Sequence, residues 1–561
     1  MRNMSLSKKF LSGQTHTSST QSSTPVWYRH VPKNLLLIFL SVITAPISIA
    51  LVLFCLIYTR INPTPNPIAL PSPLHRHEVN EQSEENADSD SLRQKNILVT
   101  GISMTKGLII LRLLSQHTPH RIICADISSV SPGRFSSATS AFYRLTPPDG
   151  SDAEPYIDSL LNVIQLEKVD LWISCSSVVA AVEDGVVVRL AEERAKANGS
   201  AGFRAIQFRE DVVETLHEKD RFIEYIQSLR LRVPESHRCT SREEVLQVLL
   251  PDSEPESSTN QNQREGEEKG GVKYILKPIG VDDRARAAMM TLLPFSSPQE
   301  TTSYVNNLTI EPQNPFQLQQ FIQGDEYCTH ALIVRGRVVA FTACPSSELL
   351  MHYCALPSNS RLSKAMLAFT QRVAEDGGED FTGHLSFDFL VPSTKSNNNG
   401  SNSGANKSKI EEDEDGNLVI YPIECNPRAH TAIALFADTP ALSSAYLSVF
   451  SPPSSLDVRD IVTPAVPTQN FYWIGHDLVT LLILPVLDAA WGVATVDDVL
   501  KGWIEFGEHV LAWRDGTFDV SDPIPFAVLY HVYWPLVFMG KLWQGREWSR
   551  INVSTTKVFD G

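Results

Sequence analysis

The 561-residue chain has no excess of basic residues, since 48 Lys and Arg stand against 64 Asp and Glu, giving a net charge of −16. This balance excludes the basic face that a nucleic-acid-binding protein needs, so we expect no nucleic-acid partner. The eight cysteines show no C-x-x-C spacing and no small-domain disulfide framework. We therefore expect reduced, mostly buried thiols, which are typical of a cytosolic setting.

The sequence also lacks the G-x-G-x-x-G signature of dinucleotide-binding enzymes. Gly101 and Gly107 follow an apolar run at residues 96–100, and an acid, Asp126, lies 25 residues after the first glycine. A dinucleotide-dependent oxidoreductase is therefore a weak alternative. The apolar runs and the helical stretches between them still predict a βαβ unit and a third strand. The expected strands cover residues 96–100, 121–125 and 169–175, and the expected helices end at 115 and cover 153–167.

Residues 34–59 contain no charged side chain. As a helix this run is about 39 Å long, which exceeds the ~30 Å hydrocarbon core of a bilayer. A signal peptide would have a shorter apolar region nearer the start, followed by a cleavage site. We predict a membrane segment, either a single pass or a hairpin broken at Pro46.

The sidedness of this segment stays open in the sequence. Residues 1–33 form a Ser/Thr-rich basic tail that we expect to be disordered, and the positive-inside rule keeps such a tail cytosolic while sending the rest across. The unpaired cysteines instead favour a cytosolic folded part, which is the arrangement we prefer. A flexible, proline-rich and then acidic tether is expected at residues 60–94.

Two strand-like runs carry a set of oxygen ligands. Asp388 lies in the first run, and Glu424 and Asn426 lie in the second, after a Ser/Asn/Gly/Lys tract at residues 393–416 that has no core-forming residues. If the two runs pair, Asp388 lies beside Glu424, and Asn426 lies on the same face. Two carboxylates and an amide suit Mg²⁺, with Mn²⁺ possible, and Arg428 suits a phosphoryl group. The alternative is that these are solvated charges at strand ends followed by a turn.

The order of charged residues along the chain resembles the ATP-grasp superfamily. In that superfamily an acid on one strand precedes an E-x-N-x-R strand, as Asp388 precedes residues 424–428 here. The resemblance implies an α/β fold, with a Rossmann-like domain ahead of an ATP-grasp module, and ATP as cofactor. Lys219 and Lys277 would contact the phosphates, and Glu326 the ribose hydroxyls. The loop after Lys277 departs from the superfamily because it has one glycine where many members have several, so the side-chain charge of Arg284 or Arg286 would replace backbone contacts to the phosphates. The same resemblance places the segment Gln319 to Ile322, including Phe321, along the adenine.

A narrower resemblance is to the mycosporine-glycine synthase family, over residues 95–530. It rests on the strings Met104-Thr105-Lys106, Tyr274-Ile-Leu-Lys277, Glu326-x-Cys328-Thr329-His330, Ile423-Glu-Cys-Asn-Pro-Arg428-x-His430, Tyr472-Trp-Ile and Asp522-Pro-Ile-Pro-Phe526. This resemblance implies that ATP drives the joining of glycine, or another amino acid, to the cyclohexenone 4-deoxygadusol. His330 and His430 are then candidates for orienting the enolate or taking the amine proton, with Arg428 acting on the phosphoryl group.

Two other functions remain open at this point: an ATP-grasp carboxylate–amine ligase with another acceptor, and a membrane-tethered scaffold that binds ATP without catalysis. The expected organisation is a pre-grasp domain at 95–207, an ATP-grasp domain at 208–450 with insertions at 251–271 and 393–416, and an extension at 451–561. In that extension the apolar run 478–487 is too short to span a membrane, so we expect it to be core.

Overall fold

The computed structural model describes residues 30–62, 93–149, 152–177, 180–197, 202–251, 272–279, 291–346, 351–394, 409–414, 416–452, 456 and 460–560. The tail up to residue 29, the insertion 252–271, most of the tract 393–416, and Arg286 lie outside the described residues. Within them, helices accompany both parallel and antiparallel sheets. The predicted α/β fold class is therefore confirmed.

The first sheet is parallel throughout and has the strand order β3-β2-β1-β4-β5. This order and the helices between the strands make it Rossmann-like, as predicted. Two of its strands, β3 and β5, were not expected from the sequence because three or four residues carry too little periodicity. The elements are β1 (Asn96–Thr100), α2 (Thr105–His117), β2 (Arg121–Asp126), β3 (Ala141–Arg144), α3 (Glu154–Leu166), β4 (Leu171–Ile173), α4 (Ala181–Ala197) and β5 (Arg204–Ile206).

The turn after β1 is held by Gly101 and by Asp126. Gly101 has φ +70°, and a Cβ there would lie 2.5 Å from the carbonyl oxygen of Cys175, so only glycine fits. Asp126, the acid that suggested a ribose contact, accepts hydrogen bonds from the backbone N–H of Ser103 (2.8 Å) and of Ser128 (3.0 Å). Its carboxylate therefore holds the turn, which leaves it no free face for a ribose.

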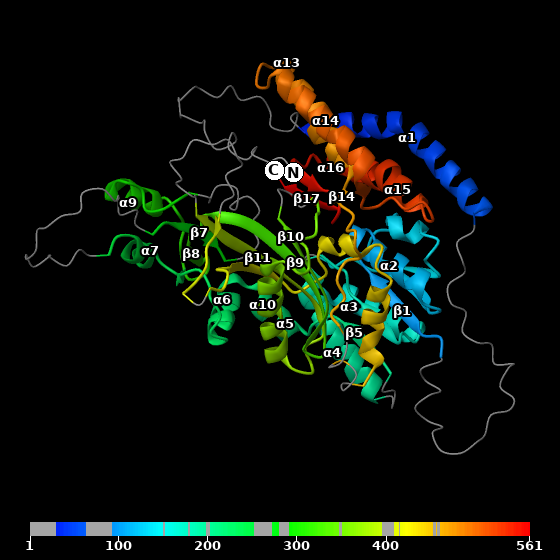
Figure 1. The fold of residues 1–561 in the computed structure, drawn as a ribbon, viewed down its shortest axis with the longest axis horizontal. Coiled ribbons are helices and arrows are strands. Elements are labelled where there is room, and N and C mark those ends of the chain that lie inside the picture. The colour runs from blue at the N-terminus through cyan, green and yellow to red at the C-terminus, as the bar shows by residue number, and fades with distance from the viewer. Residues whose placement is uncertain are drawn as a thin grey trace, which may run out of the picture.

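Two antiparallel sheets follow (Figure 1). The smaller has the order β6-β8-β7 and carries the short helices α7 and α9; the larger pairs β10, β9, β11 and β13, with β12 at one end. Both are held by their own hydrophobic clusters, and α5, α6 and α10 pack against the larger sheet. The bounds are α5 (Glu210–His217), α6 (Lys219–Ser228), β6 (Ser236–Cys239), α7 (Arg242–Leu249), β7 (Tyr274–Pro278), α9 (Pro298–Asn306), β8 (Phe316–Gln320), β9 (Gly324–Val334), β10 (Arg337–Pro345), α10 (Arg361–Gly377), β11 (Gly383–Thr394), β12 (Lys409–Ile410) and β13 (Tyr421–Asn426).

The C-terminal part is built onto the Rossmann-like sheet. Arg112 on α2 donates from Nε to Asp522 Oδ2 at 2.9 Å and from Nη2 to the Asp522 carbonyl oxygen at 2.7 Å, and both side chains are buried. Trp473 donates to Thr105 Oγ1 at 3.0 Å. The strings around residues 472 and 522 therefore join two parts of the molecule. The elements are η6 (Thr431–Phe436), α11 (Ala441–Leu447), η7 (Ser448–Phe450), β14 (Phe471–Tyr472), α12 (Ile474–Asp477), η9 (Leu478–Ile483), α13 (Leu484–Ala490), α14 (Val496–Ala512), β15 (Arg514–Asp515), α15 (Ile524–Val528), η10 (Leu529–Tyr533), α16 (Trp534–Gln544), β16 (Trp548–Asn552) and β17 (Lys557–Asp560).

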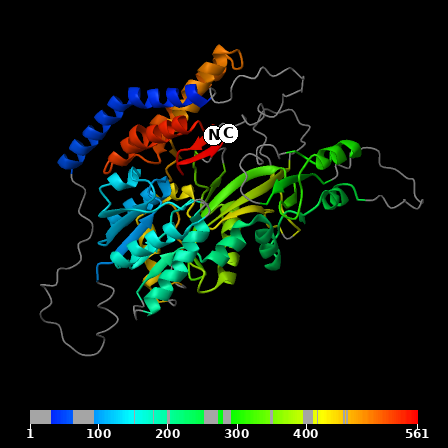
Figure 2. The same cartoon turned by 180° about the vertical axis from the view of Figure 1, so that it is seen from behind.

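The charge-free segment forms one helix, α1 (His30–Ile61), and its length and composition are sufficient to cross a membrane. The predicted hairpin alternative is wrong, because the helix continues through Pro46 and only changes direction midway (Figures 1 and 2). A proline removes one backbone hydrogen bond, which bends a helix without ending it when the flanking turns hold. α1 also contacts the far end of the chain: Lys33 Nζ donates to the carbonyl oxygen of Trp548 at 3.0 Å.

Two expectations about apolar residues have different outcomes. All eight cysteines are free and seven are buried, as predicted.

The apolar run 478–487, expected to be core, lies at the surface: η9 and α13 have no buried residue, and Leu484 is 44% exposed. Its length alone suggested burial, but most of its residues are only half-buried, and Leu478 and Val479 line a cavity beside α1.

Candidate active site

Strands β11 and β13 bring the predicted metal ligands together. Asp388 lies directly opposite Glu424 in the antiparallel register, and Ser386 lies opposite Asn426. The Asn426 amide donates from Nδ2 to Asp388 Oδ2 at 3.3 Å. The alternating residues Phe387 and Cys425 are buried in the core, which leaves the polar residues on the other face of the sheet. The predicted pairing of the two carboxylates is thus present.

Arg428 extends this cluster. It donates from Nη2 to Asn426 Oδ1 at 3.0 Å, while its Nε–H is buried and has no partner among the described residues. Burial lowers the pKa of this guanidinium, and the charges of Glu424 and Asp388 oppose that effect. A buried donor without a partner costs free energy unless a ligand supplies an acceptor. The site is therefore arranged to receive an oxygen-rich group beside two carboxylates.

Lys219 reaches the same neighbourhood from a helix. It is the first residue of α6, and both α5 and α6 pack against β13. His217, two residues earlier, has its pKa lowered mainly by burial, and it also feels the charges of Glu424, Arg428 and Lys219. These charges therefore surround one imidazole. The lysine that the sequence placed just before the helix lies in its first turn.

The smaller sheet holds the second predicted lysine. Lys277 on β7 donates from Nζ to Gln319 Oε1 on β8 at 2.8 Å, across two antiparallel strands. Gln319 is buried and also donates to Ser236 Oγ at 3.3 Å, so its side chain is committed to the sheet. The segment between β8 and β9 contains Phe321, whose backbone N–H bonds the Lys273 carbonyl oxygen at 2.7 Å, and the buried Ile322.

Glu326 lies at the exposed beginning of β9 and accepts a hydrogen bond from Ser346 Oγ at 2.9 Å. It pairs in register with Leu390 on β11, two residues from Asp388. Glu326 therefore belongs to the same sheet as the carboxylate cluster. It lies near the start of β9, six residues after the end of β8 in the smaller sheet. The alternative phosphate contacts Arg284 and Arg286 lie outside the described residues.

The two candidate catalytic histidines lie inside the protein. His330 is fully buried on β9, and its Nδ1 accepts from the backbone N–H of His430 at 3.3 Å. Burial lowers the pKa of His330 to about 3 and that of His430 well below its usual value. Such imidazoles are poor proton acceptors near neutral pH. Both side chains therefore fit a structural role better than the predicted role of taking the amine proton.

These buried histidines predict acid sensitivity of the fold. Because the pKa of His330 is about 3 when folded and 6.5 usually, the folded state binds fewer protons between these values, and the free energy of unfolding falls as the pH falls through that window. For His330 the loss is about 1.6 kcal/mol between pH 6.5 and 5. Urea unfolding of His330→Phe at both pH values should show a smaller difference than wild type. An unchanged difference would contradict the assignment.

Lys106 is a site residue that sequence reasoning gave no role. It lies on α2 with no exposed surface, and its Nζ donates to the carbonyl oxygens of Ser176 (2.7 Å) and Ala429 (3.0 Å). Burial and the nearby Arg428 lower its pKa to about 7. Lys106 thus holds the segment 428–430 from the Rossmann-like sheet. Its only sequence signal was the Met-Thr-Lys string after the Gly101 turn.

No family model matches the sequence, and no curated protein matches it. Solved structures with a similar fold include an N5-carboxyaminoimidazole synthetase from Staphylococcus aureus (12% identity, 63% of this chain, 77% of that chain, TM-score 0.39). A second is an L-amino acid ligase from Bacillus licheniformis (15% identity, 68% of this chain, 80% of that chain, TM-score 0.40). A third is a biotin carboxylase in complex with β,γ-ATP from Campylobacter jejuni (14% identity, 64% of this chain, 72% of that chain, TM-score 0.42). These structures share a fold with this chain at 12–15% sequence identity.

Proposed function

We propose that this protein is an ATP-grasp ligase that joins glycine, or another amino acid, to 4-deoxygadusol. The observation that carries the proposal is the direct pairing of Asp388 with Glu424, with Asn426 and Arg428 hydrogen-bonded beside them. The order of Lys219, Lys277 and Glu326 ahead of that cluster supports it. The choice of acceptor rests on the sequence resemblance alone.

The donor set fits a hard divalent cation. Two carboxylates and an amide oxygen on adjacent strands are the ligands that Mg²⁺ takes in nucleotide sites, and Mn²⁺ accepts the same oxygens. Asp388, Glu424 and Asn426 would hold the ion. When bound, it would neutralise charge on the β- and γ-phosphates of ATP.

The cationic side chains have complementary tasks. Lys277 and Lys219 would bind phosphate oxygens as point charges, and Arg428 would meet the oxygens of the transferred phosphoryl group through its unpartnered Nε–H. Backbone groups near Phe321 and Ile322 would contact the adenine. Glu326 would accept hydrogen bonds from the ribose hydroxyls. The tasks of Phe321, Ile322 and Glu326 are those that the ATP-grasp resemblance implies.

The enol of 4-deoxygadusol is a vinylogous carboxylic acid, which explains why a ligase of this kind suits it. Its enol oxygen attacks the γ-phosphorus, the bond to the β–γ bridging oxygen breaks, and ADP leaves. The amine nitrogen then adds to the activated ring carbon, phosphate departs with the C–O electron pair, and the nitrogen loses a proton. The product is an enaminone. Water must be excluded, because it would otherwise hydrolyse the enol phosphate.

The same proposal places the catalytic part in the cytosol and on a membrane. ATP and free thiols are found on that side, and the eight free cysteines agree with it. α1 provides the apolar segment that would hold the protein to the bilayer.

The test is ADP release from the purified full chain with ATP, Mg²⁺ and 4-deoxygadusol, with each amino acid in turn. We expect release that depends on both acceptor and amine, with glycine the preferred amine, together with the appearance of an enaminone chromophore. Release with ordinary carboxylic acids, and none with the cyclohexenone, would favour the carboxylate–amine ligase. ATP binding without turnover for any pair would overturn the enzymatic assignment and support the scaffold.

A further inference from the structure

Helix α1 buries small and polar side chains against the protein and exposes most of its large apolar side chains, while Leu37 and Leu40 also face the C-terminal helices. The inward residues recur every seven positions, which is two helical turns, so they form one stripe. Phe39 and Ile43, on other faces, are 59% and 52% exposed. A helix that packs on a soluble protein has the opposite arrangement. The inward stripe, called here the polar stripe, consists of Asn34, Ser41, Ser48 and Cys55, of which Ser41 is half-buried and the others are buried.

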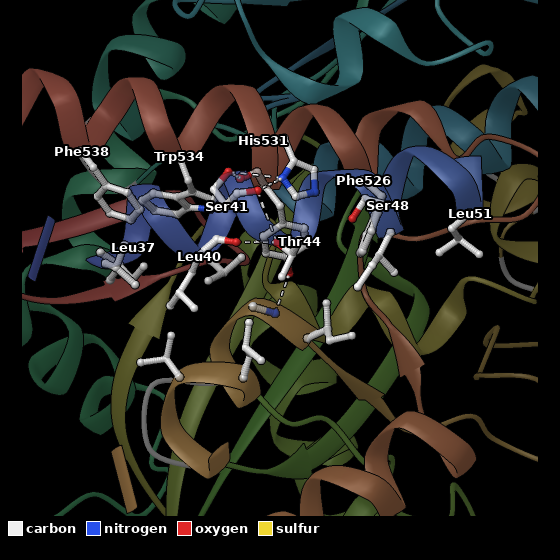
Figure 3. Close-up of a pocket in the computed structure, with 18 of the residues that line it drawn as sticks. Leu37, Leu40, Ser41, Thr44, Ser48, Leu51, Phe526, His531, Trp534 and Phe538 are labelled. Carbon is white, nitrogen blue, oxygen red and sulfur yellow. Dashed lines mark hydrogen bonds between the residues drawn. The ribbon is translucent and has the colours of Figure 1, made fainter. Parts of the chain in front are cut away.

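The polar stripe lies on the C-terminal helices along most of its length. Trp548 Nε1 donates to Asn34 Oδ1 at 3.1 Å, and Ser41 Oγ donates to the Tyr530 carbonyl oxygen at 2.8 Å. Between α1 and the C-terminal helices is a cavity of about 280 Å³. Its mostly apolar walls come from α1, α15, η10 and α16 (Figure 3). Small and polar residues at a contact between apolar helices are typical of packing within a bilayer.

These contacts leave too little of α1 free to cross a membrane alone. The polar stripe runs from Asn34 to Cys55, about 33 Å of helix, and only residues 56–61 extend beyond it, about 9 Å. The hydrocarbon core is about 30 Å thick. Wherever α1 enters lipid, the C-terminal helices that it contacts must enter as well.

The C-terminal helices carry a matching apolar surface. Of the 36 exposed large apolar residues in the described part of the chain, 14 lie on α1 and 16 lie between residues 484 and 543, with six elsewhere. On α14 the side chains Val496, Leu500, Ile504 and Leu511 are 51–88% exposed and follow the helical repeat. Figures 1 and 2 both show α1, α13 and α14 on one side of the molecule, away from the Rossmann-like sheet and the two larger antiparallel sheets. Monomeric soluble proteins rarely expose so much apolar surface in one region.

We propose that α1, α13, α14 and α16 form a single membrane-embedded face that enters one leaflet of a phospholipid bilayer. The protein is then monotopic: its N-terminal tail and its sheets lie on the same side. Trp491, Trp503 and Trp543, which are 50–93% exposed, would lie at the level of the headgroups, where indole rings are enriched. An acyl chain of the same lipid would fill the apolar cavity. The proposal goes beyond the ligase function and does not depend on it.

The first test is flotation of the purified full chain with vesicles of phosphatidylcholine and phosphatidylserine. The variant Leu500→Asp/Ile504→Asp leaves α1 intact and changes only exposed positions on α14. We expect its vesicle partitioning to be at least about tenfold weaker than that of wild type, with an unchanged melting temperature. The matched control is Leu166→Asp on α3, a 68% exposed leucine far from this face, which should float as wild type does.

Equal flotation of the α14 variant and wild type would overturn the proposal, since α1 alone would then be the anchor. A lipid-free dimer that the α14 variant dissociates, without flotation of the wild type, would also overturn it, because a second copy would cover the face. The second test is protease access in sealed vesicles to an N-terminal tag and to the sheets. We expect both to be cleaved from the same side. Protection of only one would show a spanning helix.

Discussion

Glu424→Ala and Asp388→Ala are each expected to abolish ADP formation while the protein stays folded. Both carboxylates face the same space from adjacent strands, and loss of either removes an oxygen ligand from the proposed cation. Because that cation stabilises charge that develops during phosphoryl transfer, the expected loss in turnover is at least about a thousandfold. ADP release under saturating ATP and acceptor measures it. Retained turnover in either variant would refute the metal assignment.

The stability of the same variants distinguishes a lost ligand from a lost fold. Two like charges placed directly opposite each other on paired strands destabilise a sheet. Glu424 also stabilises the charge of the neighbouring Arg428, so removing it relieves one repulsion and weakens one attraction, and the melting temperature should change little when no Mg²⁺ is present. Mg²⁺ with ADP should stabilise wild type and not the variant. Asp325→Ala, which removes an exposed carboxylate from β9, is the matched control and should keep both activity and stabilisation.

The second large effect is expected for Lys277→Met. The side chain keeps its length on β7 but loses the charge that would bind the phosphates and the donor that bonds Gln319. ATP affinity, measured by calorimetry, should fall roughly 10- to 100-fold, as for loss of a hydrogen bond to a charged group. Turnover at saturating ATP should fall less than affinity does if Lys277 acts mainly in binding.

Lys273→Met is the control for that experiment. Lys273 is an exposed lysine four residues earlier, just before the same strand. The Lys273→Met variant should leave ATP affinity unchanged, because the exposed Lys273 ammonium donates to the carbonyl oxygen of Pro294. Equal losses in the two lysine variants would indicate a general effect of charge on the smaller sheet, and would remove the specific role of Lys277.

The part of the site that depends on local patterns was predictable. Asp388 and Glu424 each lie in a short apolar run, and a polar tract between such runs makes antiparallel pairing the simplest connection. Lys219 was placed by the helix that begins at it, and Lys277 by the strand that contains it. These inferences need only the alternation of side chains within about ten residues.

The contacts between distant segments were not predictable in the same way. Lys106 meets Ala429 across 323 positions, and Arg112 meets Asp522 across 410. A single buried lysine or aspartate has no periodicity, so its sequence neighbours do not show whether it lies inside or on the surface. His330 and His430 illustrate a related difficulty, because their residue type suggests proton transfer while their burial, a tertiary property, lowers their pKa.

The surface position of η9 and α13 shows where composition misleads. An apolar run too short to span a bilayer suggested core, because in water the alternative is costly exposure. Exposure of the run is not costly if lipid is the solvent on that side, because apolar side chains in lipid do not have to be buried by the protein. The arrangement of α1 also favours lipid as the solvent. The proposed membrane face therefore accounts both for the exposed run 478–487 and for the outward apolar side chains of α1.

The contact between α1 and β16 constrains how this protein is made. Asn34 and its partner Trp548 are 514 positions apart, so a ribosome at 5–20 residues per second finishes the second roughly 25 to 100 seconds after the first. Throughout that interval the nascent chain exposes the apolar helix α1, because the segment that contains Trp548 has not yet been translated. Under the proposed membrane attachment, a targeting factor or the bilayer would hold it meanwhile, so delivery to the lipid would precede completion of the fold.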